Sequence, residues 1–263
     1  MLQKETIDNI ATALFSAERE AFEVDKFVDN YPQLNADLAY RAQERLIEMK
    51  CEAEKTKIAG RKLGLTSVAK QQMMGVHEPV YGVLLDSMRL TEDTPISLAP
   101  FIHPKIEPEI AFVFKRELKG SSVSVPEVLD ATAYVMPALE IIDSRYRNFS
   151  FTLPDVIADN ASSSRFILGG PYFKPDEADL RLMGMVFKKN GQVISTSTGA
   201  AVMGHPARAI AWMVNKLAEA GQSIQPGEIV LSGALCEATA VSAGDLITVS
   251  MDGLGSATAF FTN

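Results

Sequence analysis

The sequence predicts a mixed α+β protein in which helices over residues 1–57 precede a β-rich body over residues 58–263. The first fifty-odd residues have helical periodicity, and short strand-like runs broken by Gly, Pro and Asp follow from Ile58 onward. These runs do not alternate regularly with helices, so a doubly wound parallel sheet is disfavoured. Because the 263 residues contain neither an internal repeat nor an obvious linker, we expect a single domain over residues 1–263.

Three helices are expected. Apolar side chains recur at helical spacing over residues 7–15, which predicts the first helix. The second begins after an Asn35 cap and runs to about Lys55. The third lies near residues 206–220, with a proline at its start and a glycine just past its end.

Strands are expected where short apolar or β-branched runs are bounded by turn residues. The predicted strands cover residues 58–65, 80–85, 109–114, 134–142, 228–232 and 246–251. The dipeptide Asp252-Gly253 predicts a turn before a final strand.

Composition excludes several classes of protein. A net charge of -8 gives no electrostatic footprint for nucleic acid or for an anionic membrane. No apolar run approaches the roughly 20 residues that span a bilayer, and the N-terminus resembles neither a signal nor a transit peptide. Cys51 and Cys236 are too few for a disulfide framework. We therefore expect a cytoplasmic protein with free cysteines and no nucleic-acid or membrane partner.

The stretch HPKIEPEIAFVF, residues 103–114, carries the strongest chemical signal. Side chains alternate between the two faces of a strand, so Glu107 and Glu109 leave the backbone on the same face. Two carboxylates held that close repel each other unless a cation or a shared proton compensates them. Because oxygen ligands suit hard divalent ions, Mg²⁺ or Mn²⁺ is the natural compensator. The alternative is a solvent-facing pair on an edge strand.

A third carboxylate fits the same interpretation. Glu140 lies alone in the apolar run VMPALEIID, where an unpaired buried carboxylate would be costly. Asp143 has the opposite parity, so a regular strand would direct it to the other face. The alternative for Glu140 is an ion pair with Arg145 or a nearby lysine.

Two cationic side chains are further candidates. Lys62 lies between glycines in GRKLGLTS, where the chain could approach a ligand closely, but these residues alone favour a surface lysine. If buried beside a cation, its pKa should fall, which would suit a proton carrier or oxyanion partner. The segment ADNASSSRF is rich in short polar side chains that are typical of turns and helix caps. Its Arg165 has the side chain best shaped for binding a carboxylate.

Together these segments resemble the fumarylacetoacetate hydrolase superfamily, and within it the branch of meta-cleavage hydratases and decarboxylases. The matching segments run in family order from about Gly60 to Phe261 and include GRKLGLTS, HPKIEPEIAFVF, MPALEIIDSR, ADNASSSRFILGG and PGEIVLSGAL. The resemblance implies a β-rich, barrel-like catalytic fold behind the N-terminal helices. It also implies a homo-oligomer and, for a decarboxylase, a complex with the partner hydratase of the pathway.

The resemblance assigns roles to individual residues. It implies an Mg²⁺ or Mn²⁺ site at Glu107, Glu109 and Glu140. It implies catalytic roles for Lys62, Asp159 and Glu78, and substrate contacts for Leu63, Asn160, Ser162 and Arg165.

The resemblance implies a lyase, and three segments favour decarboxylation of 2-oxo-3-hexenedioate to 2-hydroxypenta-2,4-dienoate and carbon dioxide. The segment IHPKIE (102–107) differs from the Gln-Pro-Arg form of the hydratases, and YRNF (146–149) and SSSRF (162–166) are similar to the decarboxylase. Arg165 would orient the second carboxylate of this 2-oxo diacid. The departing carboxylate is a vinylogue of that in a β-keto acid, so its electrons can run onto the 2-oxo oxygen. No organic cofactor is required. The alternatives are a 2-oxopent-4-enoate hydratase, a hydrolase of acylpyruvates, and a non-catalytic partner, which the carboxylate triad disfavours.

Overall fold

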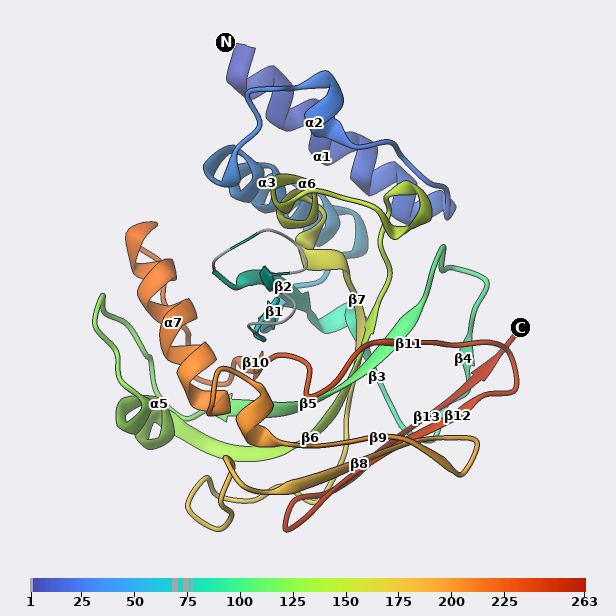
Figure 1. The fold of residues 1–263 in the computed structure, drawn as a ribbon. Helices are drawn as coiled ribbons and strands as arrows, with labels where there is room; N and C mark the ends of the chain where they lie inside the picture. Colours follow the sequence, from blue (N-terminus) through green and yellow to red (C-terminus); the bar gives the residue numbers. More distant parts are fainter. Residues whose placement is uncertain (1, 68–70, 73–75, 77) are drawn as a thin grey trace.

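The computed structural model describes residues 2–67, 71–72, 76 and 78–263 (Figure 1). Three helices lie together at the N-terminal end of the molecule, namely α1 (Leu2–Glu20), α2 (Phe27–Asn30) and α3 (Ala36–Glu54). The predicted start of α3 is confirmed, because the side chain of Asn35 accepts a hydrogen bond of 3.0 Å from the Leu38 amide. Lys55 ends this helix in the left-handed conformation.

The larger of two sheets has eight strands in the order β2-β1-β10-β5-β6-β7-β3, with β11 paired to β5. The strands are β1 (Ile58–Gly64), β2 (Val80–Leu85), β3 (Arg89–Leu90), β5 (Lys105–Phe114), β6 (Thr132–Ile142), β7 (Ser163–Leu168), β10 (Ile229–Leu231) and β11 (Thr239–Ala240). β1 runs parallel to β10 and β3 to β7, whereas the other pairs are antiparallel. This mixed, curled sheet confirms the predicted α+β class and its barrel-like body (Figure 1).

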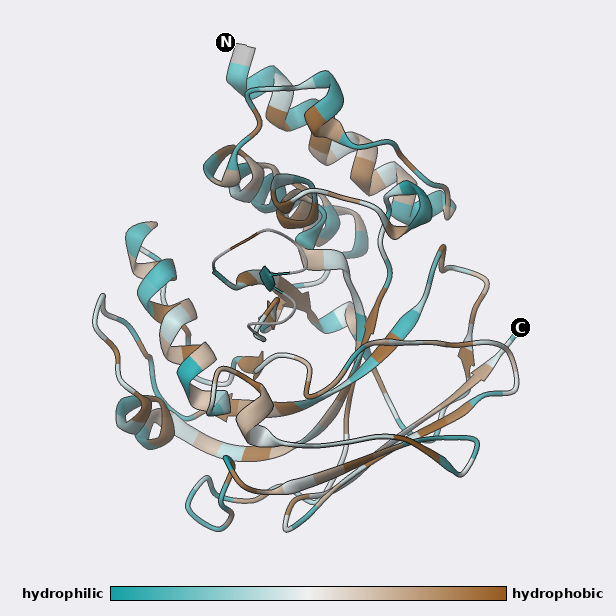
Figure 2. Cartoon of the chain, in the orientation of Figure 1, coloured by the Kyte–Doolittle hydropathy of each residue, from teal (hydrophilic) through white to brown (hydrophobic). Residues whose placement is uncertain are grey.

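The second sheet has five strands in the order β4-β13-β12-β8-β9 and packs beneath the first (Figure 1). Its strands are β4 (Ile96–Ser97), β8 (Gly184–Lys189), β9 (Gln192–Thr198), β12 (Leu246–Met251) and β13 (Gly255–Thr262). Phe187, Val249 and Phe261 belong to the same buried core as Ile110 and Leu139 of the first sheet. The apolar colouring of the facing strands in Figure 2 follows this core.

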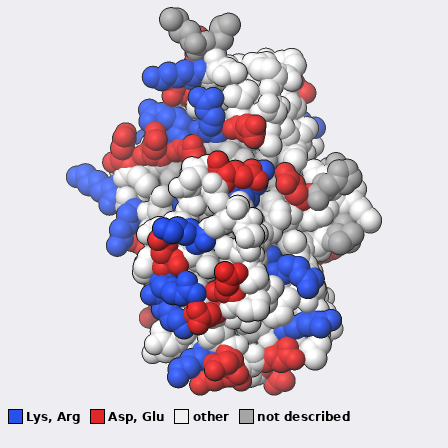
Figure 3. Space-filling model, turned by 90° about the vertical axis from the view of Figure 1, so that its left-hand side faces the viewer, with Lys and Arg blue, Asp and Glu red and all other residues white. Residues whose placement is uncertain are grey.

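Further α-helices in the described part of the chain are α5 (Val125–Ala131), α6 (Leu153–Ala158) and α7 (Pro206–Glu219). α5 and α7 flank the first sheet, whereas α6 lies beneath the N-terminal helices (Figure 1). Lys and Arg are interspersed with Asp and Glu over the described residues of the face shown in Figure 3, which gives no extended field of one sign there. No helix of the described chain is long and apolar enough to cross a membrane.

The predicted helices and strands are present, with shifts of a few residues at several ends. Six strands of the described chain were not predicted, namely β3, β4, β7, β8, β9 and β11, and neither were helices α2, α5 and α6. β3, β4 and β11 are only two residues long. For β7 and β9, the reason is visible in their composition. β7 begins within the serine-rich segment that predicted turns, and β9 (QVISTST) has hydroxyl side chains on an exposed edge instead of an apolar face.

Candidate active site

Three glutamates meet where β5 and β6 pair. Glu107 lies directly opposite Glu140 in the antiparallel register, and Glu109 follows Glu107 on the same face. Carboxylate oxygens of all three lie within 4.8 Å of one another. The exposed fractions are 5% for Glu107 and 0% for the other two. The predicted carboxylate cluster is therefore present, and its burial excludes the alternative of a solvent-facing pair.

The electrostatics of this triad favour a cation. Burial, reinforced by Glu140 and Glu107, raises the pKa of Glu109 well above its ordinary value. Burial also raises the pKa of Glu140 to about 7, although Lys62 opposes this shift. Glu109 Oε2 accepts a hydrogen bond of 2.6 Å from the Gly233 amide, whereas its buried Oε1 has no hydrogen-bond partner in the described part of the chain. Three oxygen donors with an unpartnered buried oxygen fit a hard divalent ion.

Lys62 of β1 completes the cluster. Its Nζ lies 3.1 Å from Glu140 Oε2 and donates a hydrogen bond of 3.0 Å to the Ala161 carbonyl. Burial alone would lower the pKa of Lys62, but the three carboxylates outweigh it and raise that pKa. Lys62 is thus buried, which excludes a surface lysine, but its pKa is raised by the carboxylates instead of lowered as expected beside a cation. The alternative for Glu140, an ion pair with a nearby lysine, is therefore also present, and that lysine is Lys62.

A cavity of about 90 Å³ opens beside these groups. Its polar lining consists of Lys62, Glu107 and Ser162, and its remaining walls are Gly64, Leu65, Val80, Ile142, Phe149, Phe151, Val156 and Ala161. A larger hollow of about 650 Å³ lies elsewhere, lined by residues such as Lys115 and Tyr134, and contains no member of the triad. The smaller cavity is the candidate active site because a buried acid cluster and a buried lysine converge there.

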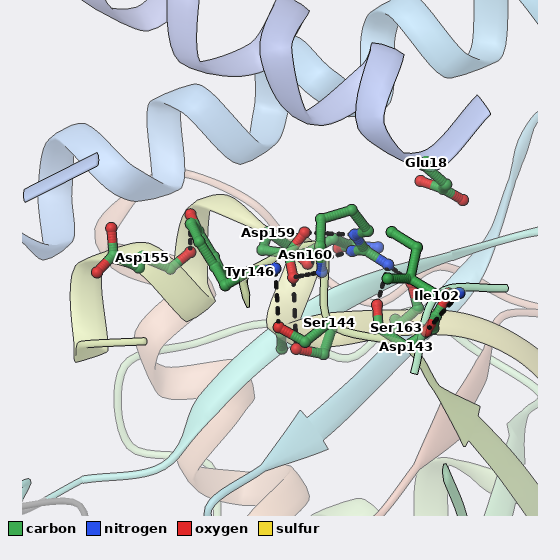
Figure 4. Close-up of polar contacts among 12 residues, drawn as sticks. Glu18, Ile102, Asp143, Ser144, Tyr146, Asp155, Asp159, Asn160 and Ser163 are labelled. Atoms are coloured by element: carbon green, nitrogen blue, oxygen red, sulfur yellow. Dashed lines mark hydrogen bonds and ion pairs between the residues drawn. The ribbon is translucent and has the colours of Figure 1, made fainter. Parts of the chain in front are cut away.

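The segment after α6 is held in place by Arg145, which the sequence had suggested only as a partner for Glu140. Its guanidinium forms a buried ion pair with the Asp159 carboxylate and donates hydrogen bonds of 2.6 Å to the carbonyls of Asp143 and Asp159. Figure 4 labels Asp143, Asp159 and Ser163 among the residues that these polar contacts join. Burial raises the pKa of Asp159 to about 7, and the attraction of Arg145 offsets only part of that shift. Asp159 therefore has a fixed partner and does not project freely into the cavity.

The polar residues that follow Asp159 contact different parts of the structure. The Asn160 side chain accepts a hydrogen bond of 2.7 Å from the Val83 amide and donates one of 2.9 Å to the Val83 carbonyl, which ties this segment to β2. Ser162 lines the cavity. Ser163, which the sequence did not single out, donates a hydrogen bond of 3.0 Å to Glu140 Oε1. Only the pairing of β6 with β7 reveals that contact.

Three other predicted site residues are not brought to the cavity. Leu63 is fully buried in the apolar core, since it alternates with Lys62 along β1. Glu78 lies on the exposed surface before β2. Arg165 pairs with Ile141 and so leaves the sheet on the face opposite to Glu140. The structure therefore gives no support to the predicted catalytic role of Glu78 or to the predicted substrate contacts of Leu63 and Arg165.

Arg165 lines a separate hollow with Glu18, Lys50 and Pro100. Its guanidinium carbon lies 5.8 Å from the centre of the Phe101 ring, and its NH1 lies 4.0 Å from Glu18 Oε1.

Asp143 also lies apart from the triad, because its carboxylate accepts hydrogen bonds from the amides of Ile102 and His103.

Comparison with known proteins places the chain among related enzymes. The profile of the fumarylacetoacetate (FAA) hydrolase C-terminal family matches residues 57–261. The chain is 42% identical over 260 residues to 4-oxalocrotonate decarboxylase from Pseudomonas putida, covering 99% of this chain and 98% of that protein. It is 36% identical to 2-hydroxyhexa-2,4-dienoate hydratase from Comamonas testosteroni, covering all of both chains. The structure of the decarboxylase from Pseudomonas putida G7, complexed with magnesium and adipate, superposes with a TM-score of 0.95 at 41% identity over 98% of each chain.

Proposed function

The chain belongs to the fumarylacetoacetate hydrolase family, in its meta-cleavage branch of decarboxylases and hydratases, and we propose that it is the lyase that decarboxylates 2-oxo-3-hexenedioate. The products would be 2-hydroxypenta-2,4-dienoate and carbon dioxide. The observation that carries this proposal is the contact between buried Lys62 and the Glu107, Glu109 and Glu140 triad beside a cavity with mainly apolar walls. The relative with magnesium and adipate, a six-carbon diacid, supports both the metal and the length of the substrate.

Glu107, Glu109 and Glu140 would hold Mg²⁺ or Mn²⁺. A divalent ion bound there would supply Lewis-acid stabilisation of negative charge on the 2-oxo acid. The chain itself provides the fixed oxygen donors, and Gly233 and Ser163 keep two of them in place through hydrogen bonds.

Lys62 would act on the oxygen that becomes negative. When the bond between C5 and C6 breaks, the C6 carboxylate leaves as carbon dioxide and its electron pair moves through the C3–C4 double bond onto the 2-oxo oxygen. An ammonium group aimed at that oxygen stabilises the dienolate and can protonate it to the dienol. The Ala161 carbonyl and Glu140 hold Lys62 protonated and in position for this role.

Decarboxylation is favoured over hydration by the surroundings of the cavity. Hydration of the dienol requires a group that activates water, and neither predicted acid is placed for it, because Asp159 pairs with Arg145 and Glu78 is exposed. The side chains of Val80, Phe149 and Phe151 line the cavity and disfavour ordered water. The hydratase remains the second candidate, since a hydratase aligns with the whole chain at 36% identity.

To test this proposal, the protein is incubated with Mg²⁺ and either the diacid or 2-hydroxypenta-2,4-dienoate, and carbon dioxide release and dienol consumption are measured. Decarboxylation predicts release of carbon dioxide from the diacid and no consumption of the dienol. Consumption of the dienol, without carbon dioxide from the diacid, would contradict the proposal and assign the hydratase.

Assembly is a separate proposal. The resemblance implies a homo-oligomer and a complex with the pathway hydratase, and the edge strand β9 offers one surface for association. Its sequence QVISTST carries no charge that would oppose pairing with another strand. Light scattering of the purified protein, alone and with that hydratase, measures the mass of the homo-oligomer and of the complex. A monomeric mass in each sample would contradict both proposed assemblies.

A further inference from the structure

We infer that Lys105 binds the second carboxylate of the substrate, at the end opposite the carboxylate triad. The inference rests on the proposed function, because only a diacid has this second carboxylate. Lys105 begins β5, and its parity places it on the same face of the strand as Glu107 and Glu109. One repeat of two residues, about 7 Å along a strand, separates Lys105 from Glu107.

The neighbours of Lys105 connect it to the cavity. Its partner on β6 is Ile142, whose side chain lines the cavity. The Lys105 ammonium lies 4.1 Å from the centre of the Phe149 ring, and Phe149 is another cavity wall. β5 thus presents Glu109, Glu107 and Lys105 in a row, with two anions at one end and a cation at the other.

The charge of Lys105 is available for a ligand. Within the described part of the chain, its ammonium contacts an aromatic ring and forms no ion pair with a carboxylate. The residue is half-buried, so an incoming carboxylate would meet a partly desolvated cation next to an apolar wall. Lys62 does not offer the same free charge, because Glu140 pairs with it.

Arg165, the cation predicted for this task, is placed differently. It lies on the opposite face of the sheet, near Glu18 and against the face of the Phe101 ring. A diacid with its 2-oxo acid end at Glu107 would have to pass through the sheet to reach it. Lys105, and not Arg165, therefore lies on the face from which a side chain can orient the second carboxylate.

The chemistry predicts which kinetic constant Lys105 controls. The carboxylate that it would bind becomes neutral carbon dioxide, so the attraction weakens as the C5–C6 bond breaks. An interaction that is stronger with bound substrate than with the transition state improves binding and does not raise kcat. Loss of the charge should raise KM for the diacid about 10- to 100-fold, as expected for a hydrogen bond to a charged group, without lowering kcat.

The test compares Lys105→Met, Lys105→Arg and the control Arg165→Met. Methionine keeps an unbranched stem against Phe149 but removes the charge, and arginine keeps the charge. Calorimetric titration of the Mg²⁺-loaded proteins with adipate and with hexanoate separates recognition of the second carboxylate from turnover. Steady-state kinetics with 2-oxo-3-hexenedioate gives kcat and KM for the same variants.

The inference predicts that the unaltered protein and Lys105→Arg prefer adipate, and that Lys105→Met loses this preference with a raised KM. Equal binding of adipate and hexanoate by the unaltered protein, or an adipate preference that persists in Lys105→Met, would overturn it. A loss confined to Arg165→Met would also overturn it and restore Arg165. If adipate recognition depends on Lys105 but the diacid releases no carbon dioxide, the proposed function fails and this binding site stands.

Discussion

Lys62 Nζ lies 3.1 Å from Glu140 Oε2, and both side chains are almost completely buried. The pair joins β1 to β6, which are not neighbours in the sheet, because β10 and β5 lie between them. A buried ion pair alone is weak grounds for stability, since desolvation offsets much of its attraction. Here Glu107 and Glu109 add two more carboxylates beside the single cation. Burial and this crowding of carboxylates raise the pKa values of Glu109 and Glu140, and a divalent ion would compensate the charge of all three carboxylates.

The first prediction concerns Lys62. Lys62→Met should lower kcat by about 10²- to 10³-fold, because it removes the cation that stabilises charge on the 2-oxo oxygen. Steady-state kinetics at saturating Mg²⁺ measures the effect. The control is Lys57→Met, whose side chain is 82% exposed and which should leave kcat unchanged. A Lys62→Met protein with undiminished kcat would remove this residue from the reaction.

The second prediction concerns the triad. Glu109→Gln removes a carboxylate whose charged form is disfavoured by burial and by its two neighbours, so the metal-free protein should keep or gain stability while its affinity for Mn²⁺ falls more than about tenfold. Titration calorimetry gives the affinity, and thermal unfolding without metal gives the stability. Glu219→Gln, on the exposed end of α7, is the control and should bind Mn²⁺ as the unaltered protein does. Unchanged Mn²⁺ affinity in Glu109→Gln would exclude the triad as the metal site.

The third prediction concerns acid stability. Burial alone would raise the pKa of Glu18, but Lys50, Arg145 and Arg165 outweigh it and lower the pKa to about 2. Its unfolded value is 4.5, so this carboxylate stabilises the fold above pH 4.5 and loses that contribution as the pH falls toward 2. The shift corresponds to about 3 kcal/mol at neutral pH.

Urea unfolding of Glu18→Gln and of the unaltered protein at pH 7 and pH 3 measures this contribution. The difference in unfolding free energy between the two proteins should be largest at pH 7 and smaller at pH 3. A difference that is the same at both pH values would show that the Glu18 charge contributes nothing to acid stability.

The fourth prediction concerns Arg145. Arg145→Met breaks the buried ion pair with Asp159 and should lower the free energy of unfolding by about 3–5 kcal/mol. The double variant with Asp159→Asn should recover only part of that loss, because the guanidinium also binds the carbonyls of Asp143 and Ser163. Urea unfolding provides the values. Arg147→Met, an exposed neighbour, should cost less than about 1 kcal/mol; equal costs would refute the special role of Arg145.

The acid triad could be predicted from sequence because it depends on a local rule. The two-residue period of a strand fixes Glu107 and Glu109 on one face whatever the rest of the fold does. Glu140 was identified by its apolar surroundings, since such a run predicts a buried strand. The register that sets Glu140 opposite Glu107 is a long-range property, and no local pattern specifies it.

The position of Arg165 could not be predicted for the same reason. Its face depends on a strand that the serine-rich sequence concealed, and the register of β7 shifts between Ile141 and Ile142. Ser163 was missed because its contact with Glu140 arises from that pairing. Lys105 was visible beside the E-x-E pair, but its relation to Phe149 requires the folded chain.

The most direct measurement follows 2-oxo-3-hexenedioate labelled with ¹³C at its C6 carboxylate, with Mg²⁺ and either the unaltered protein or Glu109→Gln. If the triad and Lys62 serve a decarboxylase, the label appears in carbon dioxide at the rate at which the diacid disappears, and Glu109→Gln releases almost none. Label that stays in an organic product while the diacid is consumed would contradict the central claim. Equal release by the two proteins would contradict the role of the triad.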